Sequence, residues 1–316
     1  MTNAVQIRGV SKSFGQTNAV VDVDLDVPQG SLCGFLGPNG AGKSTTIRML
    51  MSIIHADQGT VEVLGTNALK SKDRIGYLPE ERGVYRKMKV GHFVEYIGRL
   101  KGVAGCELKK QTDTWLERVE LPGIRNKRCE ELSKGMQQKV QFLAAIIHEP
   151  ELIILDEPFS GLDPVNARVI GQIIDELHQQ GRTILFSTHV LSQAEKICDR
   201  IVMIDQGKKV LDGTVSSIQS QFDPRVIRIE PTDMQCDLHS IHGATVIKRN
   251  EKEKQILMRL QEGAEAPAIL SQIVQQQSVQ GIEIVRPTLD EIFIEQVERN
   301  RGHEAALQVR EEMKHV

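Results

Sequence analysis

A glycine-rich segment of eight residues constrains the fold of this chain more than any other feature. Its residues are Gly37, Pro38, Asn39, Gly40, Ala41, Gly42, Lys43 and Ser44. An apolar stretch, residues 31–36, precedes the segment, and apolar side chains at helical spacing follow it from Ile47 to Ile54. Glycines allow the backbone to curl so that successive N–H groups converge at the first turn of a helix, an arrangement that binds phosphate groups. The order of strand, glycine-rich loop and helix therefore predicts a site for a nucleoside triphosphate.

Three side chains at the end of this segment have the chemistry that a bound triphosphate requires. Lys43 supplies a positive charge toward the β- and γ-phosphates, and the Ser44 hydroxyl can be a ligand of Mg²⁺. Thr45 is placed to contact the α-phosphate. The alternative, a glycine-rich turn that arose by chance, does not account for the strand before the segment and the helix after it.

Two adjacent acids end a second apolar strand, residues 152–157. A buried carboxylate is costly unless a cation or a hydrogen-bond donor compensates it. We expect Asp156 to hold Mg²⁺ and Glu157 to accept a proton from the attacking water. The alternative is a strand end that meets solvent, which is common for a single acid and less suited to this pair ahead of Pro158.

The order of apolar patterns predicts an α/β core. A period-two alternation over residues 21–27 indicates a strand with one buried face. The apolar strands at 152–155 and 183–187 enclose an amphipathic helix that begins at Asp163-Pro164, and such alternation predicts a parallel sheet. Helical spacing over about 85–148 predicts a helical subdomain inserted in this first domain.

A composition shift after residue 218 predicts a second, smaller domain. Short strands and two helices, near 267–276 and 288–299, indicate an α+β fold. We therefore expect a first domain over residues 1–218, an accessory domain over 222–300 and a charged tail over 301–316 that frays.

Composition limits the classes of partner and the cellular compartment that we expect for this protein. The formal net charge is −3, from 39 basic and 42 acidic residues, so no chain-wide positive field holds nucleic acid, and we expect no nucleic-acid partner. The 5 cysteines have no metal-site or redox-motif spacing and are interpreted as buried thiols of a reducing compartment. No apolar stretch approaches the length of about 20 residues that a membrane-spanning helix needs. No signal-peptide pattern opens the chain, so we expect a cytoplasmic protein.

Further motifs, in a fixed order, make the chain similar to the ABC ATPase family over residues 4 to 215. They are Leu132-Ser133-Lys134-Gly135-Met136-Gln137-Gln138, similar to the family signature, Ser160-Gly161-Leu162-Asp163, similar to the loop after the acidic strand, and Ser187-Thr188-His189, similar to the switch histidine. The resemblance implies a P-loop NTPase fold: an ABC cassette with a parallel core sheet, an antiparallel β subdomain and the inserted helical subdomain. The small C-terminal α+β domain is added to it.

The resemblance also implies roles for single residues. The signature residues Ser133, Lys134, Gly135 and Met136 would contact ATP held by a second copy of the chain, so that two copies close head to tail around two nucleotides. His189 would bond the γ-phosphate; its alternative is a histidine that is merely hydrogen-bonded in place. Phe14 would stack on adenine; its alternative is a core aromatic.

The sequence departs from the family pattern in two motifs. Glu80 stands where the family usually has glutamine, and a carboxylate can also ligate Mg²⁺. Lys134 and Met136 stand where the family usually has glycine and glutamine; Lys134 either supplies a positive charge to the partner's phosphate or points to solvent. Both departures occur in exporter-type motors, whose C-terminal extension resembles residues 287–293. That extension is interpreted first as a stabilising appendage and otherwise as a regulatory or dimer-bracing element.

These observations together predict the ATP-binding and ATP-hydrolysing subunit of a membrane exporter. The expected cofactors are ATP and Mg²⁺, and the expected partners are a separate transmembrane permease and a second copy of the chain. The permease would hold the chain on the inner face of the cell membrane. The alternatives are a soluble ABC ATPase of translation or DNA maintenance, and a nucleotide-sensing module that does not hydrolyse ATP.

Overall fold

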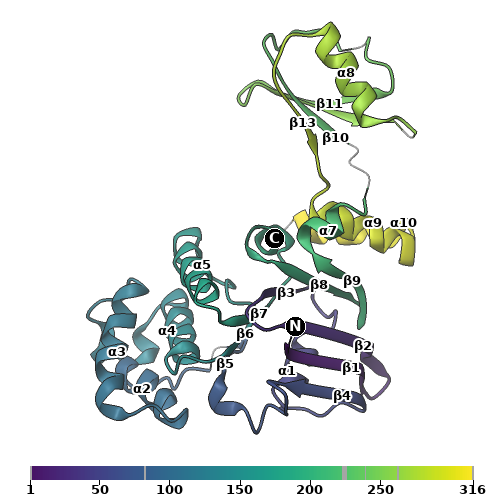
Figure 1. Cartoon of the computed structure of the whole chain (residues 1–316). Coiled ribbons are helices and arrows are strands. Elements are labelled where there is room, and N and C mark those ends of the chain that lie inside the picture. The colour runs from purple at the N-terminus through teal and green to yellow at the C-terminus, as the bar shows by residue number, and fades with distance from the viewer. Residues whose placement is uncertain (1, 82, 223–225, 239, 262, 315–316) are drawn as a thin grey trace. The chain divides into compact units, whose positions relative to one another are not determined.

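The computed structural model describes residues 2–314 except 82, 223–225, 239 and 262; the side chains of 106 and 312–314 are also outside the description. It divides into two compact units, Met1–Thr214 and Val215–Val316 (Figure 1). Residues 215–218 were expected in the first domain. They belong to the second unit, because helix α7, Val215–Gln219, packs against helix α9, Leu289–Arg301.

A six-stranded sheet with the order β5-β6-β7-β3-β8-β9 forms the centre of the first unit. Its strands are β3 (Leu32–Leu36), β5 (Ile75–Leu78), β6 (Leu152–Asp156), β7 (Thr183–Thr188), β8 (Arg200–Asp205) and β9 (Lys208–Thr214). The first five run parallel, and β9 returns antiparallel to β8. Every residue of β3, β6 and β7 is buried, which is typical of parallel strands covered on both faces. The predicted parallel core is confirmed.

The register of this sheet brings three loops together at one edge. Leu36 of β3 lies opposite Thr188 of β7, and Asp156 of β6 lies opposite Ser187. The carboxyl ends of the three strands are therefore level. Helix α1, Lys43–Leu50, follows β3 at this edge, and helix α6, Leu191–Ile197, follows β7.

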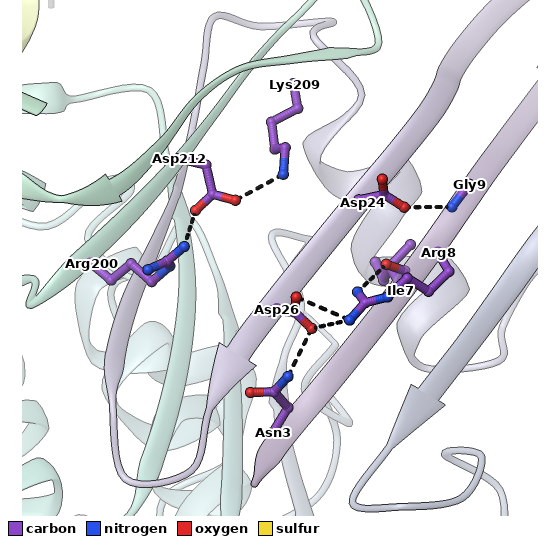
Figure 2. A network of polar contacts seen from close by, with 9 residues as sticks. All are labelled: Asn3, Ile7, Arg8, Gly9, Asp24, Asp26, Arg200, Lys209 and Asp212. Carbon is purple, nitrogen blue, oxygen red and sulfur yellow. Dashed lines mark hydrogen bonds and ion pairs between the residues drawn. The ribbon is translucent and has the colours of Figure 1, made fainter. Parts of the chain in front are cut away.

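A second sheet of the first unit is antiparallel, with the order β2-β1-β4. Its strands are β1 (Asn3–Phe14), β2 (Thr17–Pro28) and β4 (Gln58–Val63). Figure 2 shows polar side chains that join the neighbouring strands β1 and β2: Arg8 Nη2 donates to Asp26 at 2.8 and 3.0 Å, and Asn3 donates to Asp26 at 2.8 Å. In the neighbouring hairpin, Asp212 accepts from Arg200 at 2.5 Å and from Lys209 at 2.8 Å. The antiparallel subdomain is thus confirmed.

Helices cluster beside strands β5 and β6 (Figure 1). They are α2 (Val90–Leu100), α3 (Gly105–Arg118) and α4 (Lys134–Ile146), with short 3₁₀ turns at Lys72–Arg74, Ile124–Asn126 and Cys129–Glu131. The buried Glu95 carboxylate of α2 pairs with Arg99 and Arg125, and Arg125 also pairs with Asp113 at 2.7 Å. Helix α5, Pro164–Gln179, begins where Asp163 Oδ1 accepts the N–H of Asn166 at 2.8 Å.

The second unit is an antiparallel sheet with the order β11-β12-β10-β13 and its own apolar core. Its elements are β10 (Val226–Pro231), β11 (Ala244–Asn250), β12 (Gln255–Leu260), β13 (Val279–Val285), α8 (Ala266–Gln276), α9 and α10 (His303–Lys314). The expectation of a frayed tail is wrong for the described residues, because Ala306 and Val309 of α10 are buried. Residues 315–316 lie outside the description.

The cysteines differ in burial. Cys33 and Cys129 are buried and Cys198 and Cys236 are half-buried, so the expectation of uniformly buried thiols is wrong for two of the four described side chains. Cys106, whose side chain lies outside the description, was covered by the same expectation. Burial raises the pKa of Cys33 to about 12, which keeps this thiol protonated and unreactive.

We expect His148 to make the stability of the first unit dependent on pH. Burial, with a smaller contribution from the Lys101 charge, lowers the pKa of His148 from 6.5 to about 4. The unfolded chain therefore takes up a proton at a higher pH than the folded chain does, and stability falls as pH drops from 6.5 to 4. Thermal unfolding of a His148→Gln variant should show a smaller drop over this interval. An identical drop in both proteins would contradict the assignment.

Candidate active site

The loop between β3 and α1 requires glycine at two positions. A Cβ atom on Gly37, whose φ is 150°, would lie 2.2 Å from the carbonyl oxygen of Ile204. A Cβ atom on Gly42, whose φ is 106°, would lie 2.4 Å from the carbonyl oxygen of Ala19. Gly42 is also the residue from which α1 starts. Gly42 and residues 43–45 at the start of α1 line a cavity.

The cavity has a volume of about 330 Å³. Its lining residues come from four separate parts of the first unit: Ala19, Asn39, Gly40, Gly42, Lys43, Ser44, Thr45, Glu80 and Glu157. Six of the nine predicted phosphate-loop residues and two of the predicted acids thus meet at one place, whereas Gly37, Pro38, Ala41 and Asp156 do not line the cavity. Ala19 also lines the cavity, and no motif in the sequence indicated this residue.

Lys43 is a buried cation at the centre of this site. Its Nζ donates to the carbonyl oxygens of Gly37 at 2.7 Å and Pro38 at 3.2 Å, and lies 3.7 Å from Glu157 Oε1. Burial lowers the pKa of Lys43, and the charges of Glu157, Asp156 and Glu80 oppose that shift. The three acids therefore favour the positively charged form of Lys43, although solvent hardly reaches this side chain.

Glu157 has a strained backbone and two specific partners. Its φ is 51°, which is uncommon for a residue with a side chain. Its N–H donates to the Ser187 carbonyl oxygen at 3.1 Å, and its Oε1 accepts from His189 Nδ1 at 2.9 Å. The predicted base Glu157 and the predicted switch histidine His189 are therefore in contact.

Asp156 is buried beside two hydroxyl groups. Ser187 Oγ donates to Asp156 Oδ1, and Ser44 Oγ donates to the same oxygen at 3.4 Å. Burial raises the pKa of Asp156, whereas the two serine hydrogen bonds lower it. Ser187 was recognised in sequence as part of a motif without a role of its own. Ser187 lies opposite Asp156 in the parallel sheet, and this position is what assigns a role to Ser187.

The oxygen atoms of this site are suited to Mg²⁺ in the presence of a triphosphate. Among the described residues, no group of three or more His, Cys, Asp or Glu side chains forms a metal cage. Mg²⁺ usually binds through one or two protein carboxylates together with substrate phosphates and water, so a complete cage is not required. Ser44 and Glu80 at the cavity, and Asp156 beside Ser44, have hard oxygen atoms that would suit such a site.

The signature residues lie outside the cavity. Ser133 precedes α4, and its Oγ accepts the N–H of Met136 at 3.2 Å. Ser133 and Lys134 are exposed, and none of the described residues that line the cavity comes from 133–136. A Cβ atom on Gly135 would lie 3.5 Å from Leu162. The signature and the loop of Ser160, Gly161, Leu162 and Asp163 therefore form one surface.

Phe14 is placed differently from the acids. Its side chain is 52% exposed, which excludes a core aromatic, and it is not among the described residues that line the cavity. Lys12 Nζ lies 5.5 Å from the centre of its ring. Stacking of Phe14 on adenine stays a prediction.

Alanine in place of Gly42 should damage this site more than alanine in place of Gly40. Both glycines have positive φ, but a Cβ at Gly40 meets no atom within 4 Å. The left-handed backbone costs about 1–2 kcal/mol in either variant, and the overlap with Ala19 adds about 1–3 kcal/mol in Gly42→Ala. Urea unfolding of the two variants measures the difference. Equal stabilities would contradict the described loop conformation.

Comparisons with known proteins assign both units. Residues 20–160 match the family model described as ABC transporter, and residues 213–297 match the ATP-binding protein DrrA1-3-like, C-terminal domain. The uncharacterized ABC transporter ATP-binding protein YhaQ of Bacillus subtilis (strain 168) is 38% identical over 91% of this chain and 96% of its own length. The daunorubicin/doxorubicin resistance ATP-binding protein DrrA of Streptomyces peucetius is 30% identical over 93% of this chain and 92% of its own length.

A solved structure shares the fold of the first unit. A bacterial ABC transporter cassette solved as a dimer has a TM-score of 0.63 and 23% identity, and the match covers 67% of this chain and 98% of that one. In the part of the chain that the structure describes, no helix is both long and apolar enough to cross a membrane. Because YhaQ and DrrA match nearly the whole chain and the glycine-rich loop and acids form one cavity, the chain is an ATPase of ABC transporters and belongs to the family of DrrA-like ATP-binding proteins.

Proposed function

We propose that this ATPase powers a membrane exporter, and that Lys43, Glu157 and His189 carry the hydrolysis step. The observation that supports the proposal best is the chain of contacts among these side chains at the cavity. Lys43 Nζ lies 3.7 Å from Glu157 Oε1, and the same oxygen accepts from His189 Nδ1 at 2.9 Å. A cation for the phosphates, a base for water and a group that orients the base are thus close together.

The residues act in the following way in this proposal. The N–H groups at the start of α1 and the Lys43 ammonium hold the β- and γ-phosphates. A water oxygen forms a bond to the γ-phosphorus while Glu157 takes one of the water protons. The bond from phosphorus to the bridging oxygen breaks, and ADP leaves with its electron pair. His189 orients the Glu157 carboxylate in the free chain and contacts the γ-phosphate in the complex.

The metal site of the proposal consists of Ser44, Asp156 and Glu80. Mg²⁺ bound there neutralises part of the negative charge on the phosphates. Ser187 is added to the sequence-predicted set because its hydroxyl holds Asp156 Oδ1. Asp156 is thereby fixed on the side that faces β7, and its other oxygen stays available.

The position of the signature supports a head-to-tail dimer. Residues 133–136 are at the surface and away from the cavity of their own chain, so they can reach a nucleotide held by another chain. A cassette with the same fold was solved as a dimer. In our proposal ATP joins two copies, with Ser133 and Gly135 of one covering the nucleotide on Lys43 of the other. Hydrolysis then releases the closed state.

The export direction and the permease partner are supported by the relatives. DrrA, which matches this chain across both units, is described as a drug-resistance ATP-binding protein. Removal of a toxic compound from the cell accounts for resistance. We therefore propose a separate permease that binds two copies of this chain at the inner face of the membrane.

Glu157→Gln should separate nucleotide binding from hydrolysis. The amide keeps the size of the side chain but cannot take a proton, so turnover should fall about 10²–10⁴-fold while ATP binding is retained. Size-exclusion chromatography with ATP and Mg²⁺ should then show a stable dimer. Glu149→Gln, an exposed site before the start of β6, is the matched control with wild-type turnover. Normal hydrolysis by Glu157→Gln would refute the role of this residue.

A mixture of two inactive variants tests the shared site. Lys43→Ala should lose ATP binding, and Ser133→Arg should block the face that covers the partner's nucleotide. A dimer of one Lys43→Ala chain and one Ser133→Arg chain keeps one intact composite site, so an equal mixture should regain at most about a quarter of wild-type activity. Full activity in the mixture, or in Ser133→Arg alone, would contradict the head-to-tail arrangement.

A further inference from the structure

One face of helix α4 carries two glutamine side chains that are almost completely buried. Gln138 is 2% exposed and Gln141 is 5% exposed. Residues three apart lie on the same face of a helix. The residues around them, such as Val140 and Phe142, are apolar core residues, so two amides at these positions are unexpected and call for a physical reason.

Each amide holds the loop that follows a strand of the core sheet. Gln138 Nε2 donates to the carbonyl oxygen of Pro158 at 3.4 Å, and Pro158 directly follows Glu157. Gln141 Nε2 donates to the carbonyl oxygen of Glu81 at 3.2 Å, and Glu81 directly follows Glu80. The helix that begins with the signature therefore contacts both loops that carry acids into the cavity.

The Gln141 contact matters most for the loop after β5. The described residues from 79 to 88 belong to no helix or strand, so few backbone bonds fix the position of Glu80. Gln141 reaches this loop from 60 positions away in sequence. A hydrogen bond from a buried side chain to a loop carbonyl restricts the loop, because breaking it leaves a carbonyl and an amide without partners.

The second half of the Gln141 amide makes no hydrogen bond to the described residues that would stabilise the fold. Its Oε1 is buried and has no partner among the described residues. The amide cannot be turned to relieve this, because the Glu81 carbonyl requires a donor. A methionine would fill the same space without an unpaired oxygen. The donor group is therefore what distinguishes glutamine at this position.

We propose that Gln141 is a positioning residue for the metal site: its bond to the Glu81 backbone holds the Glu80 carboxylate at the cavity, where Glu80 ligates the Mg²⁺ of bound nucleotide. The proposal rests on the proposed function, in which Glu80 is a metal ligand. The proposal also connects the signature residues, which cover a partner's nucleotide, with the metal site of the same chain. A shift of α4, produced when a partner's nucleotide engages residues 133–136, moves Gln141 and with it the loop of Glu80.

Metal binding, measured without turnover, tests the proposal. Mn²⁺ is titrated into the full chain with a non-hydrolysable ATP analogue, and free Mn²⁺ is measured by electron paramagnetic resonance. Gln141→Met should weaken Mn²⁺ binding about 10-fold, as expected for a group that orients a metal ligand. Nucleotide affinity in excess chelator should stay within about twofold of wild type, because the phosphate loop is intact. Gln141→Ala, which removes the same donor, is the second variant.

The Glu80→Ala background, which removes the ligand oxygen, shows whether Gln141 acts through Glu80. If it does, Gln141→Met should cause no further loss of Mn²⁺ affinity in that background. Gln111→Met is the matched control: Gln111 also has a buried Oε1 without a partner among the described residues, but it lies on α3 at a different cavity. It should bind Mn²⁺ as the wild type does.

The failures of the two proposals are distinguishable. Wild-type Mn²⁺ affinity in both Gln141 variants, or losses that add in the double variant, would overturn the role of Gln141 and leave the proposed function intact. Wild-type affinity in Glu80→Ala, which removes the ligand oxygen, would overturn Glu80 as a ligand and the Gln141 proposal with it. A wild-type chain that binds the analogue equally with and without Mn²⁺ would overturn the metal site of the proposed function itself.

Discussion

Strands β3, β7 and β6 are hydrogen-bonded side by side in parallel, and their carboxyl ends are level. This register is the constraint on which the candidate site depends. It places the glycine-rich loop, Asp156 and the Ser187–His189 segment at one edge of the sheet, although the loop lies more than a hundred positions before the other two in sequence. All residues of the three strands are buried, as expected for parallel strands covered on both faces, and the parallel hydrogen bonds between them define the register.

Charges that would be costly one by one are compatible at this edge because they are buried together. Lys43 would lose its proton more readily in an apolar setting, but three acids oppose that shift. Asp156 would resist ionisation, but two hydroxyl groups donate to it. The result is a set of polar groups fixed before the substrate arrives, which is the arrangement that lowers the cost of reorganisation during a reaction. The strained φ of Glu157 belongs to the same set, since its N–H is held by Ser187.

The sequence predicted those parts of the site that depend on local motifs. The phosphate loop needs glycines at fixed spacing, and the acidic pair follows an apolar strand, so both are visible without a structure. Hydrogen-bond partners on neighbouring strands, such as Ser187 for Asp156, depend on the order of the strands in the sheet. Local sequence patterns do not contain this order. Strand β1 was not predicted, because register shifts near Gly9 and Val10 interrupt its alternation. Helix α10 was missed because its charged sequence hides two buried positions, Ala306 and Val309.

Helix α4 differs from the other elements at the site because its first turn and its buried face contact different loops. Its first turn, with Ser133 as the cap, is at the surface, and the loop containing Leu162 lies against it. Its buried face holds the loops of Glu80 and Glu157 through two amide side chains. A rigid helix moves as one body, so a force on its first turn is transmitted to both acids over a few residues. The cation and the base are in contact at the cavity, and none of the described residues that line it belongs to the signature. A nucleotide covered by a second molecule would supply a contact with the signature and, through α4, adjust the acids that act on it.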